Sequence, residues 1–256
     1  MVKISILSDL HLEFLDKIPD INTKADILIL AGDIGYIDKP LFREFICDVS
    51  TKYNNKHIIY VFGNHEFYVY NDDETMDSLK KRYIEYFNEF DNIHLLDNDS
   101  FVYGDYIFVG STLWSKIPFS KKKIAEKVLN DFKMINITPQ QKITVDHYNT
   151  LHNECVSYLV NTIFKSRDKK IIVVTHHAPY INTPAGNVSN PIYNNNGLSC
   201  LYSTDLSHIF YPNIVWIFGH THWSCDFSVK NIRLISNQCG YSGEDIPFNV
   251  NLVIDL

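Results

Sequence analysis

The chain has 256 residues, of which 45% are hydrophobic and 21% are charged. This balance is typical of a folded globular protein and excludes the disordered and collagen-like classes. The formal net charge of -7 gives no broad basic surface, so a protein that coats DNA or RNA is not indicated; bound divalent cations would still let an acidic chain act on a phosphate.

Cysteine usage and hydropathy indicate the compartment. The five cysteines show no CxxC spacing, which argues against a disulfide framework and a zinc finger and favours a reducing compartment. The apolar start, Met1 to Leu7, turns polar at Ser8 and is too short for a signal peptide, and no later segment reaches membrane length. We expect one domain over residues 1–256, a cytoplasmic location, no membrane partner and no dedicated nucleic-acid-binding surface.

Short apolar runs that end in polar or glycine residues recur along the chain. Such runs are typical of buried strands that lead into loops. The predicted strands cover residues 4–7, 27–30, 58–62, 106–109, 171–174, 214–218, 232–235 and 250–254.

Two helices are predicted between these strands. Residues 73–90 carry apolar side chains at steps of three and four, as on a helix that packs on a core. Thr138 precedes Pro139, and Gln141 stands at the capping-box position, so a long helix is expected from Thr138 to about Phe164.

Three other features are interpreted without a catalytic role. His147 and His152 are five residues apart and do not share a helix face well, so we expect them to be structural or solvated. The stretch 178–197 is rich in Asn, Pro and Gly and is predicted to be a long surface loop beside a candidate site.

Residues that can bind metals follow most of the predicted strands. The carboxyl edge of an open α/β sheet is where ligands bind, so these residues are expected to meet there. Glycine before Asp33, Asn64 and His220 would allow a close backbone approach, and residues two apart, such as Asp9 and His11, would point the same way. The candidate strings are Asp9-Leu10-His11, Gly32-Asp33, Gly63-Asn64-His65-Glu66, Thr175-His176-His177 and Gly219-His220-Thr221-His222.

Each string alone is common in loops, but the ordered set is specific. It resembles the motif series of the calcineurin-like metallophosphoesterase superfamily: Asp-x-His, Gly-Asp, Gly-Asn-His-Asp/Glu, a later histidine and Gly-His-x-His. All five motifs occur in order between Asp9 and His222, across nearly the whole chain. The strings around Ser8–Phe14, 175–179 and 237–241 look most like small stand-alone microbial, phage or viral members.

The resemblance implies an α/β fold of two packed mixed β-sheets flanked by helices, a four-layer sandwich. We also consider a helical cap over the site at about 114–164. It further implies two divalent metal ions, with Mn expected and Fe, Zn or Ni as alternatives, since the ligands are oxygen and imidazole without thiolate. The implied ligands are Asp9, His11 and His222 for one ion, Asn64, His176 and His220 for the second, and Asp33 between them.

A catalytic histidine is implied next to one ligand. His65 matches the family's catalytic residue and would protonate the leaving oxygen, and His65 with Asn64 would bind the substrate phosphate. The attacking group would be a metal-bridging hydroxide. His177 is an alternative to His176 as ligand, and Glu66 is expected either to support a histidine or to form a loop salt bridge.

The implied function is hydrolysis of a phosphodiester, such as a small or cyclic nucleotide. No acidic residue follows Asp33 directly and no arginine follows His65, unlike in protein phosphatases, so a phosphoprotein substrate is disfavoured. A phosphomonoesterase or pyrophosphatase with the same site, a nuclease, or a catalytically silent scaffold are the alternatives. Trp114, Tyr241 and the 178–197 loop are candidates for the pocket wall, with core or surface packing as the alternative for each aromatic. The oligomeric state is left open.

Overall fold

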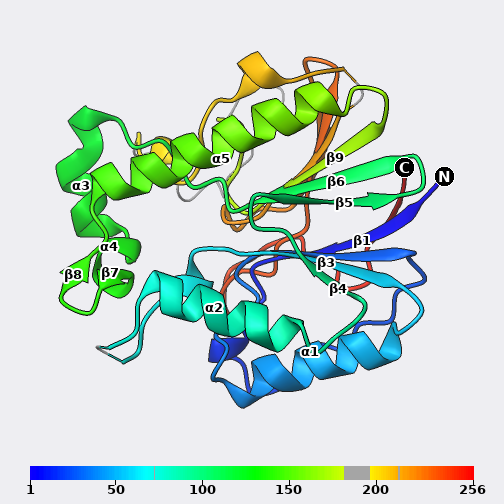
Figure 1. Ribbon diagram of the computed structural model, residues 1–256, viewed down its shortest axis with the longest axis horizontal. Coiled ribbons are helices and arrows are strands. Elements are labelled where there is room, and N and C mark those ends of the chain that lie inside the picture. The colour runs from blue at the N-terminus through cyan, green and yellow to red at the C-terminus, as the bar shows by residue number, and fades with distance from the viewer. Residues whose placement is uncertain (72, 182–196, 213) are drawn as a thin grey trace.

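The computed structural model describes residues 1–71, 73–181, 197–212 and 214–256. Two mixed β-sheets face each other, and helices cover their outer faces (Figure 1), which confirms the predicted fold class. None of the helices in the described ranges is long and apolar enough to cross a membrane. Residues 182–196 of the predicted surface loop lie outside the described residues.

The first sheet has five strands, four of them parallel. The order is β13-β1-β2-β3-β4, and only the edge strand β13 runs antiparallel to its neighbour. The bounds are β1 Lys3–Leu7, β2 Ile27–Ala31, β3 His57–Val61, β4 Ile93–Leu95 and β13 Val253–Asp255.

The second sheet has six strands with a parallel centre. The order is β11-β12-β10-β9-β6-β5, and both edge strands, β11 and β5, are antiparallel to their neighbours. The bounds are β5 Asp99–Tyr103, β6 Tyr106–Ser111, β9 Lys170–Thr175, β10 Val215–Ile217, β11 Cys225–Val229 and β12 Ile232–Ser236.

The helices lie on opposite sides of this pair of sheets. Figure 1 shows α1 (Pro40–Lys52) and α2 (Met76–Phe87) beside the first sheet and α5 (Val145–Lys165) beside the second. The remaining small elements, α3 (Lys122–Val128), α4 (Asp131–Met134), β7 (Asn136–Thr138) and β8 (Gln141–Lys142), gather at the end of the molecule away from the two termini.

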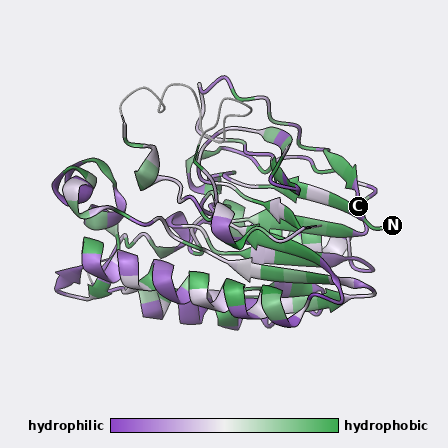
Figure 2. Cartoon of the chain, turned by 90° about the horizontal axis from the view of Figure 1, so that it is seen from above, coloured by the Kyte–Doolittle hydropathy of each residue, from purple (hydrophilic) through white to green (hydrophobic). Residues whose placement is uncertain are grey.

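The core follows from the alternation of side chains along the strands. Ile4 and Ile6 belong to a cluster between the sheets, together with Ile172 and Val174 of the opposite sheet. The alternate side chains of the strands pack outward in a second cluster that includes helix residues. Both faces of the central strands are therefore buried, which explains their continuous apolar runs. Figure 2 shows hydrophobic strands at the centre and helices that carry both kinds of residue.

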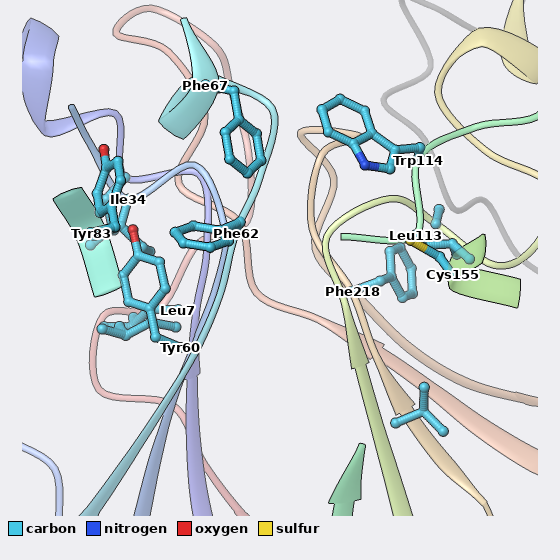
Figure 3. Packing of buried hydrophobic residues seen from close by; sticks show 14 of the residues in the cluster. Leu7, Ile34, Tyr60, Phe62, Phe67, Tyr83, Leu113, Trp114, Cys155 and Phe218 are labelled. Carbon is cyan, nitrogen blue, oxygen red and sulfur yellow. The ribbon is translucent and has the colours of Figure 1, made fainter. Parts of the chain in front are cut away.

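Aromatic side chains fill the second cluster beside both sheets (Figure 3). Tyr60, Phe62 and Tyr83 lie on the side of the first sheet, whereas Trp114 and Phe218 lie on the side of the second. All of these side chains are 2% exposed or less. Trp114 is therefore a core residue, which is the packing alternative to a place in the pocket wall.

The predicted start of the long helix at Thr138 is wrong. Thr138 ends β7, and Pro139 lies in the turn to β8. Helix α5 begins only at Val145, where the hydroxyl of Thr144 accepts a hydrogen bond from the backbone N–H of His147. Thr144, six residues after Thr138, directly precedes the apolar stripe. It is Thr144, and not Thr138, that caps the helix.

Candidate metal centre

The parallel strands of both sheets deliver the predicted ligands to one edge. Strand β1 leads to the first motif, β2 to the second and β3 to the third, while β9 and β10 of the other sheet lead to the fourth and fifth. The structure brings together all predicted site residues: Asp9, His11, Asp33, Asn64, His65, His176, His220 and His222.

The backbone at this edge adopts an unusual conformation. Left-handed φ angles occur at Asp9 (54°), His11 (48°), Asp33 (53°), His220 (68°) and His222 (47°). Such angles are uncommon for residues other than glycine and are concentrated at functional sites, where the surroundings hold them. The strands therefore end in tight turns that direct motif residues two apart toward the same site. They do not continue as extended segments there, as was expected from the sequence.

The first group of donors combines residues from the beginning of the chain with one from its last part. The imidazole Nε2 atoms of His11 and His222 lie 3.2 Å apart. The carboxylate Oδ1 of Asp9 lies 3.6 Å from Nε2 of His222. These three buried side chains offer ligand atoms that all lie within 4.8 Å of one another.

The second group lies around His176. Its Nε2 atom is 3.1 Å from Oδ1 of Asn64 and 3.3 Å from Oδ2 of Asp33. His220 joins this side, because His176, His177 and His220 offer ligand atoms within 4.8 Å of one another. The same Oδ2 of Asp33 lies 4.0 Å from Nε2 of His11, so Asp33 stands between the two groups.

These separations fit donors around common metal ions. Donors bound about 2.1 Å from one ion lie roughly 3.0–3.4 Å apart in octahedral or tetrahedral geometry. Three observed separations, of 3.1, 3.2 and 3.3 Å, lie within that range, and the fourth, 3.6 Å between Asp9 and His222, lies just above it. In addition, the buried Nε2 of His220 has no hydrogen-bond partner among the described residues. The site therefore suits two metal ions that share Asp33.

Hydrogen bonds behind the donors hold their orientation. Nδ1 of His222 lies 2.5 Å from Glu244, and Nδ1 of His176 lies 2.9 Å from the carbonyl oxygen of Ala31. The amide nitrogen of Asn64 donates to Asp131 at 2.9 Å, which leaves its oxygen facing His176. Such outer partners fix the tautomer and rotamer of metal ligands.

His65 lies at the mouth of the centre. Its backbone N–H donates to Oδ1 of Asp33 at 2.8 Å. Nδ1 of the ring lies 2.9 Å from Glu13, and Nε2 lies 3.1 Å from the hydroxyl of Tyr241. The ring of Tyr241 is in turn stacked on His11 with centroids 4.5 Å apart. Tyr241, a candidate for the pocket wall, therefore does contact the site.

Glu66 anchors the loops instead of forming a salt bridge. Its buried carboxylate accepts hydrogen bonds from the backbone N–H groups of Asp33, Ile34 and Gly63 and from the hydroxyl of Tyr60, at 2.6–3.0 Å. It thus ties the second motif to the third.

Two glycines permit this close approach. A Cβ atom at Gly63 would collide with Asp33, and one at Gly32 would collide with Gly63 and with Nδ1 of His176. Gly32 also has a left-handed φ of 86°. Glycine is therefore needed at both positions, as the sequence predicted.

Burial and neighbouring charges set the protonation of the cluster. Burial lowers the pKa of His177 and His220 well below the usual histidine value, and neighbouring histidines lower it further. Burial alone would raise the pKa of Asp33, but His176 and His65 bring it well below its ordinary value. Burial opposes protonation of His176, yet Asp33 raises the pKa of that imidazole to about 10. His220 is therefore neutral and Asp33 is anionic, as metal binding requires, whereas Asp33 holds a proton on His176 that an ion would displace on binding.

A pocket opens directly over the centre. Three tyrosines and residues of the α3–α4 segment contribute to its wall beside the candidate ligands. Its lining comprises Asp33, Asn64, His65, Tyr68, Val128, Leu129, Asn130, Asp131, Tyr202, His220, Thr221, His222 and Tyr241.

The comparison with protein families decides the identity. Residues 2–224 match the family model described as calcineurin-like phosphoesterase. The chain belongs to the calcineurin-like phosphoesterase family. It is accordingly a hydrolase that acts on phosphoesters, and the family's dependence on two metals agrees with the buried His/Asp clusters. This confirms the resemblance drawn from the motif series.

Two similar proteins extend this result. The uncharacterized protein L509 of Acanthamoeba polyphaga mimivirus is 35% identical over 269 residues, which cover 98% of this chain and 95% of that protein. The crystal structure of phosphopantetheinyl hydrolase (PptH) from Mycobacterium tuberculosis superposes with a TM-score of 0.65 at 17% identity, covering 93% of this chain and 89% of that one. The second likeness shows the shared fold of this calcineurin-like phosphoesterase.

Several residues around the centre were not identified from the sequence. Glu13, Tyr68, Asp131 and Glu244 each contact a predicted site residue, yet none stands at a motif position. Only Glu13 gave a signal, because it is the acidic residue that follows the first motif at a spacing of two.

Proposed function

We propose that this calcineurin-like phosphoesterase hydrolyses phosphodiesters at the centre around Asp33. The observation that supports the proposal is the pair of donor groups, with separations suited to metal ions, that share Asp33 beneath a pocket. One ion would be held by Asp9, His11 and His222, the second by Asn64, His176 and His220, and Asp33 would contact both.

The chemistry divides between the ions and the protein. When bound, two divalent ions polarise a phosphoryl group and lower the pKa of a water between them. His65 lines the pocket with Nε2 on the side of Tyr241, where it can donate a proton to the leaving oxygen. Asn64 and His65 would contact the bound phosphate, since both line the pocket beside Asp33.

The pocket wall favours a diester over a monoester. None of the described lining residues is Lys or Arg. A diester carries one negative charge at phosphorus, whereas a monoester dianion carries nearly two and gains more from fixed cations in addition to the metals. Tyr68, Tyr202 and Tyr241 offer apolar rings with hydroxyl groups instead, which suits a small uncharged or aromatic ester group such as that of a nucleotide.

Of the two adjacent histidines, His176 is the better ligand. It directs Nε2 at Asp33 and Asn64, while its Nδ1 is occupied by a backbone carbonyl. Nε2 of His177 instead lies 3.0 Å from the hydroxyl of Tyr148. We therefore assign the ligand role to His176.

Further features support the remaining expectations. Carboxylate, amide and imidazole donors without thiolate favour Mn, with Fe, Zn or Ni as alternatives. Val128, Leu129 and Asn130 line the pocket, so the α3–α4 segment would act as the expected cap. The five cysteines are all free, in keeping with a reducing, cytoplasmic location.

The test compares two chromogenic esters on metal-restored protein. Metal is removed, Mn²⁺ is added back, and turnover of bis-p-nitrophenyl phosphate is measured beside that of p-nitrophenyl phosphate. We expect the diester to have the higher kcat/KM and Asp33→Ala to lower it by at least about 100-fold. His65→Ala should lower it less, because p-nitrophenolate leaves without a proton and only the contact of His65 with the phosphate is lost. Preference for the monoester would replace the diester assignment. Folded protein without turnover of either ester would contradict the proposal.

A further inference from the structure

The turn after the first motif places a buried carboxylate against His65. Glu13 lies in the short 3-10 helix η1 (Leu12–Phe14), and its side chain is 1% exposed. Its Oε1 atom lies 2.9 Å from Nδ1 of His65 and 3.5 Å from Nδ1 of His11. A glutamate is rarely buried this deeply unless it is paired. His65 is the closer partner and makes the hydrogen bond.

This contact determines which nitrogen of His65 faces the pocket. A carboxylate only accepts hydrogen bonds, so Nδ1 must carry a hydrogen. Nε2 is then the atom on the side of Tyr241, and both His65 and Tyr241 line the pocket. A carboxylate bonded to the far nitrogen of an acid–base histidine holds both its tautomer and its orientation.

No other acidic residue in the described ranges can take this place. After Asp33 the chain continues with Ile34 and Gly35, so the second motif supplies no carboxylate of its own. The other described carboxylate within 4.0 Å of a ring nitrogen is that of Asp33, 4.0 Å from Nε2 and therefore on the opposite side. Among the carboxylates that the structure describes, Glu13 alone approaches Nδ1 within 4.0 Å.

We propose that Glu13 is a positioning residue that holds His65 so that Nε2 delivers its proton to the leaving oxygen. This inference rests on the proposed function, because it needs His65 as the proton donor. As a hydroxide oxygen bonds to phosphorus, the bond between phosphorus and the leaving oxygen breaks, its electron pair goes to that oxygen, and the proton of Nε2 follows it. Glu13 keeps the hydrogen bond from Nδ1 throughout.

The centre contains a matched carboxylate with a different expected role. Glu244 lies 2.5 Å from Nδ1 of His222, which is a candidate metal ligand and not a proton donor. Loss of the charge at Glu244 should therefore weaken metal binding, whereas loss of the charge at Glu13 should weaken leaving-group protonation. The two effects can be measured separately.

The experiment varies only the leaving group. Mn²⁺-loaded protein is assayed with methyl p-nitrophenyl phosphate, whose leaving group needs no proton, and with methyl phenyl phosphate, whose leaving group does. We expect Glu13→Gln to lower kcat about 10- to 100-fold for the phenyl ester and less than about 3-fold for the p-nitrophenyl ester. Glu244→Gln should lower turnover of both esters alike and raise the Mn²⁺ concentration at half-maximal activity about 10-fold.

A double substitution tests whether Glu13 acts through His65. In the His65→Ala background, Glu13→Gln should cause no further loss with the phenyl ester. Equal losses for both esters, or a full additional loss in that background, would overturn the inference. A shift in Mn²⁺ dependence like that of Glu244→Gln would also overturn it, because Glu13 would then act through His11.

The design separates this inference from the proposed function. Wild-type protein that turns over neither ester would contradict the proposed function itself. Wild-type turnover with unchanged leaving-group dependence in Glu13→Gln would contradict only the role of Glu13. Should Glu13→Gln not fold, as judged by circular dichroism, Glu13→Asp keeps the charge but shortens the side chain, and the same selective loss with the phenyl ester is expected.

Discussion

Three of the candidate donors of the centre are held by a hydrogen-bond partner that is not itself a candidate ligand. Glu244 holds His222, the carbonyl of Ala31 holds His176, and Asp131 holds Asn64. Because the side chains are buried as well, the donor atoms cannot rotate away to water. Orientation fixed before binding reduces the reorganisation needed when an ion arrives.

Asp131, the partner of Asn64, can be tested by substitution. Asp131 accepts hydrogen bonds from the amide of Asn64 at 2.9 Å and from the hydroxyl of Tyr68 at 2.7 Å. We expect Asp131→Ala to let the amide turn and to raise the Mn²⁺ concentration at half-maximal activity about 10- to 100-fold. Tyr68→Phe, which leaves the Asp131 contact in place, should have a smaller effect. An unchanged Mn²⁺ titration of Asp131→Ala would show that this contact does not orient the ligand.

The sequence could predict the donors but not these partners. The donors follow strands in a fixed motif order, so their convergence can be predicted from the chain alone. Asp131 is 67 residues from Asn64, and Glu244 is 22 residues from His222, each in a segment without a motif. Their contacts arise only from how the α3–α4 segment and the last loop pack against the sheet edge.

At the scale of the secondary-structure elements, the sequence predicted the strands that are buried on both faces. Seven of the eight apolar runs form the interior strands of the two sheets, because central strands covered on both faces need continuous hydrophobic sequence. The eighth, 250–254, overlaps the edge strand β13 only at its last two residues. The edge strands β4, β5 and β11 were missed: they are partly exposed, and the alternation in Cys225-Asp226-Phe227-Ser228 is too short to stand out. Helix α1 was also missed, although Pro40 stands at its start.

The corrected start of α5 can be tested with two threonines. Thr144 caps the helix, whereas Thr138 ends the short strand β7 and is exposed. We expect Thr144→Ala to lower the free energy of unfolding by about 1 kcal/mol, because a backbone N–H of the first turn loses its acceptor. Thr138→Ala should change it by less than about 0.5 kcal/mol. Urea denaturation measures both, and a larger loss at Thr138 would contradict this assignment of the cap.

At the scale of the molecule, the centre joins the two sheets. Strands β1, β2 and β3 of the first sheet and β9 and β10 of the second all supply candidate donors. Each proposed ion has donors from both sheets: Asp9 and His11 face His222, and Asn64 faces His176. Metal binding should therefore stabilise the packing of one sheet on the other.

Removal of metal should lower the melting temperature for this reason. A ligand at 100 times its dissociation constant stabilises the folded state by about 2.7 kcal/mol, and a chain of this size gains roughly 2–4 °C for each kcal/mol. We expect Mn²⁺ to raise Tm by roughly 5–10 °C over protein in EDTA, as measured by circular dichroism. His220→Ala should reduce this rise, whereas His208→Ala, at an exposed histidine of the 3-10 helix η5 (Ser207–Ile209), should not. Equal melting temperatures with Mn²⁺ and with EDTA would mean that the buried donors do not hold an ion across the two sheets.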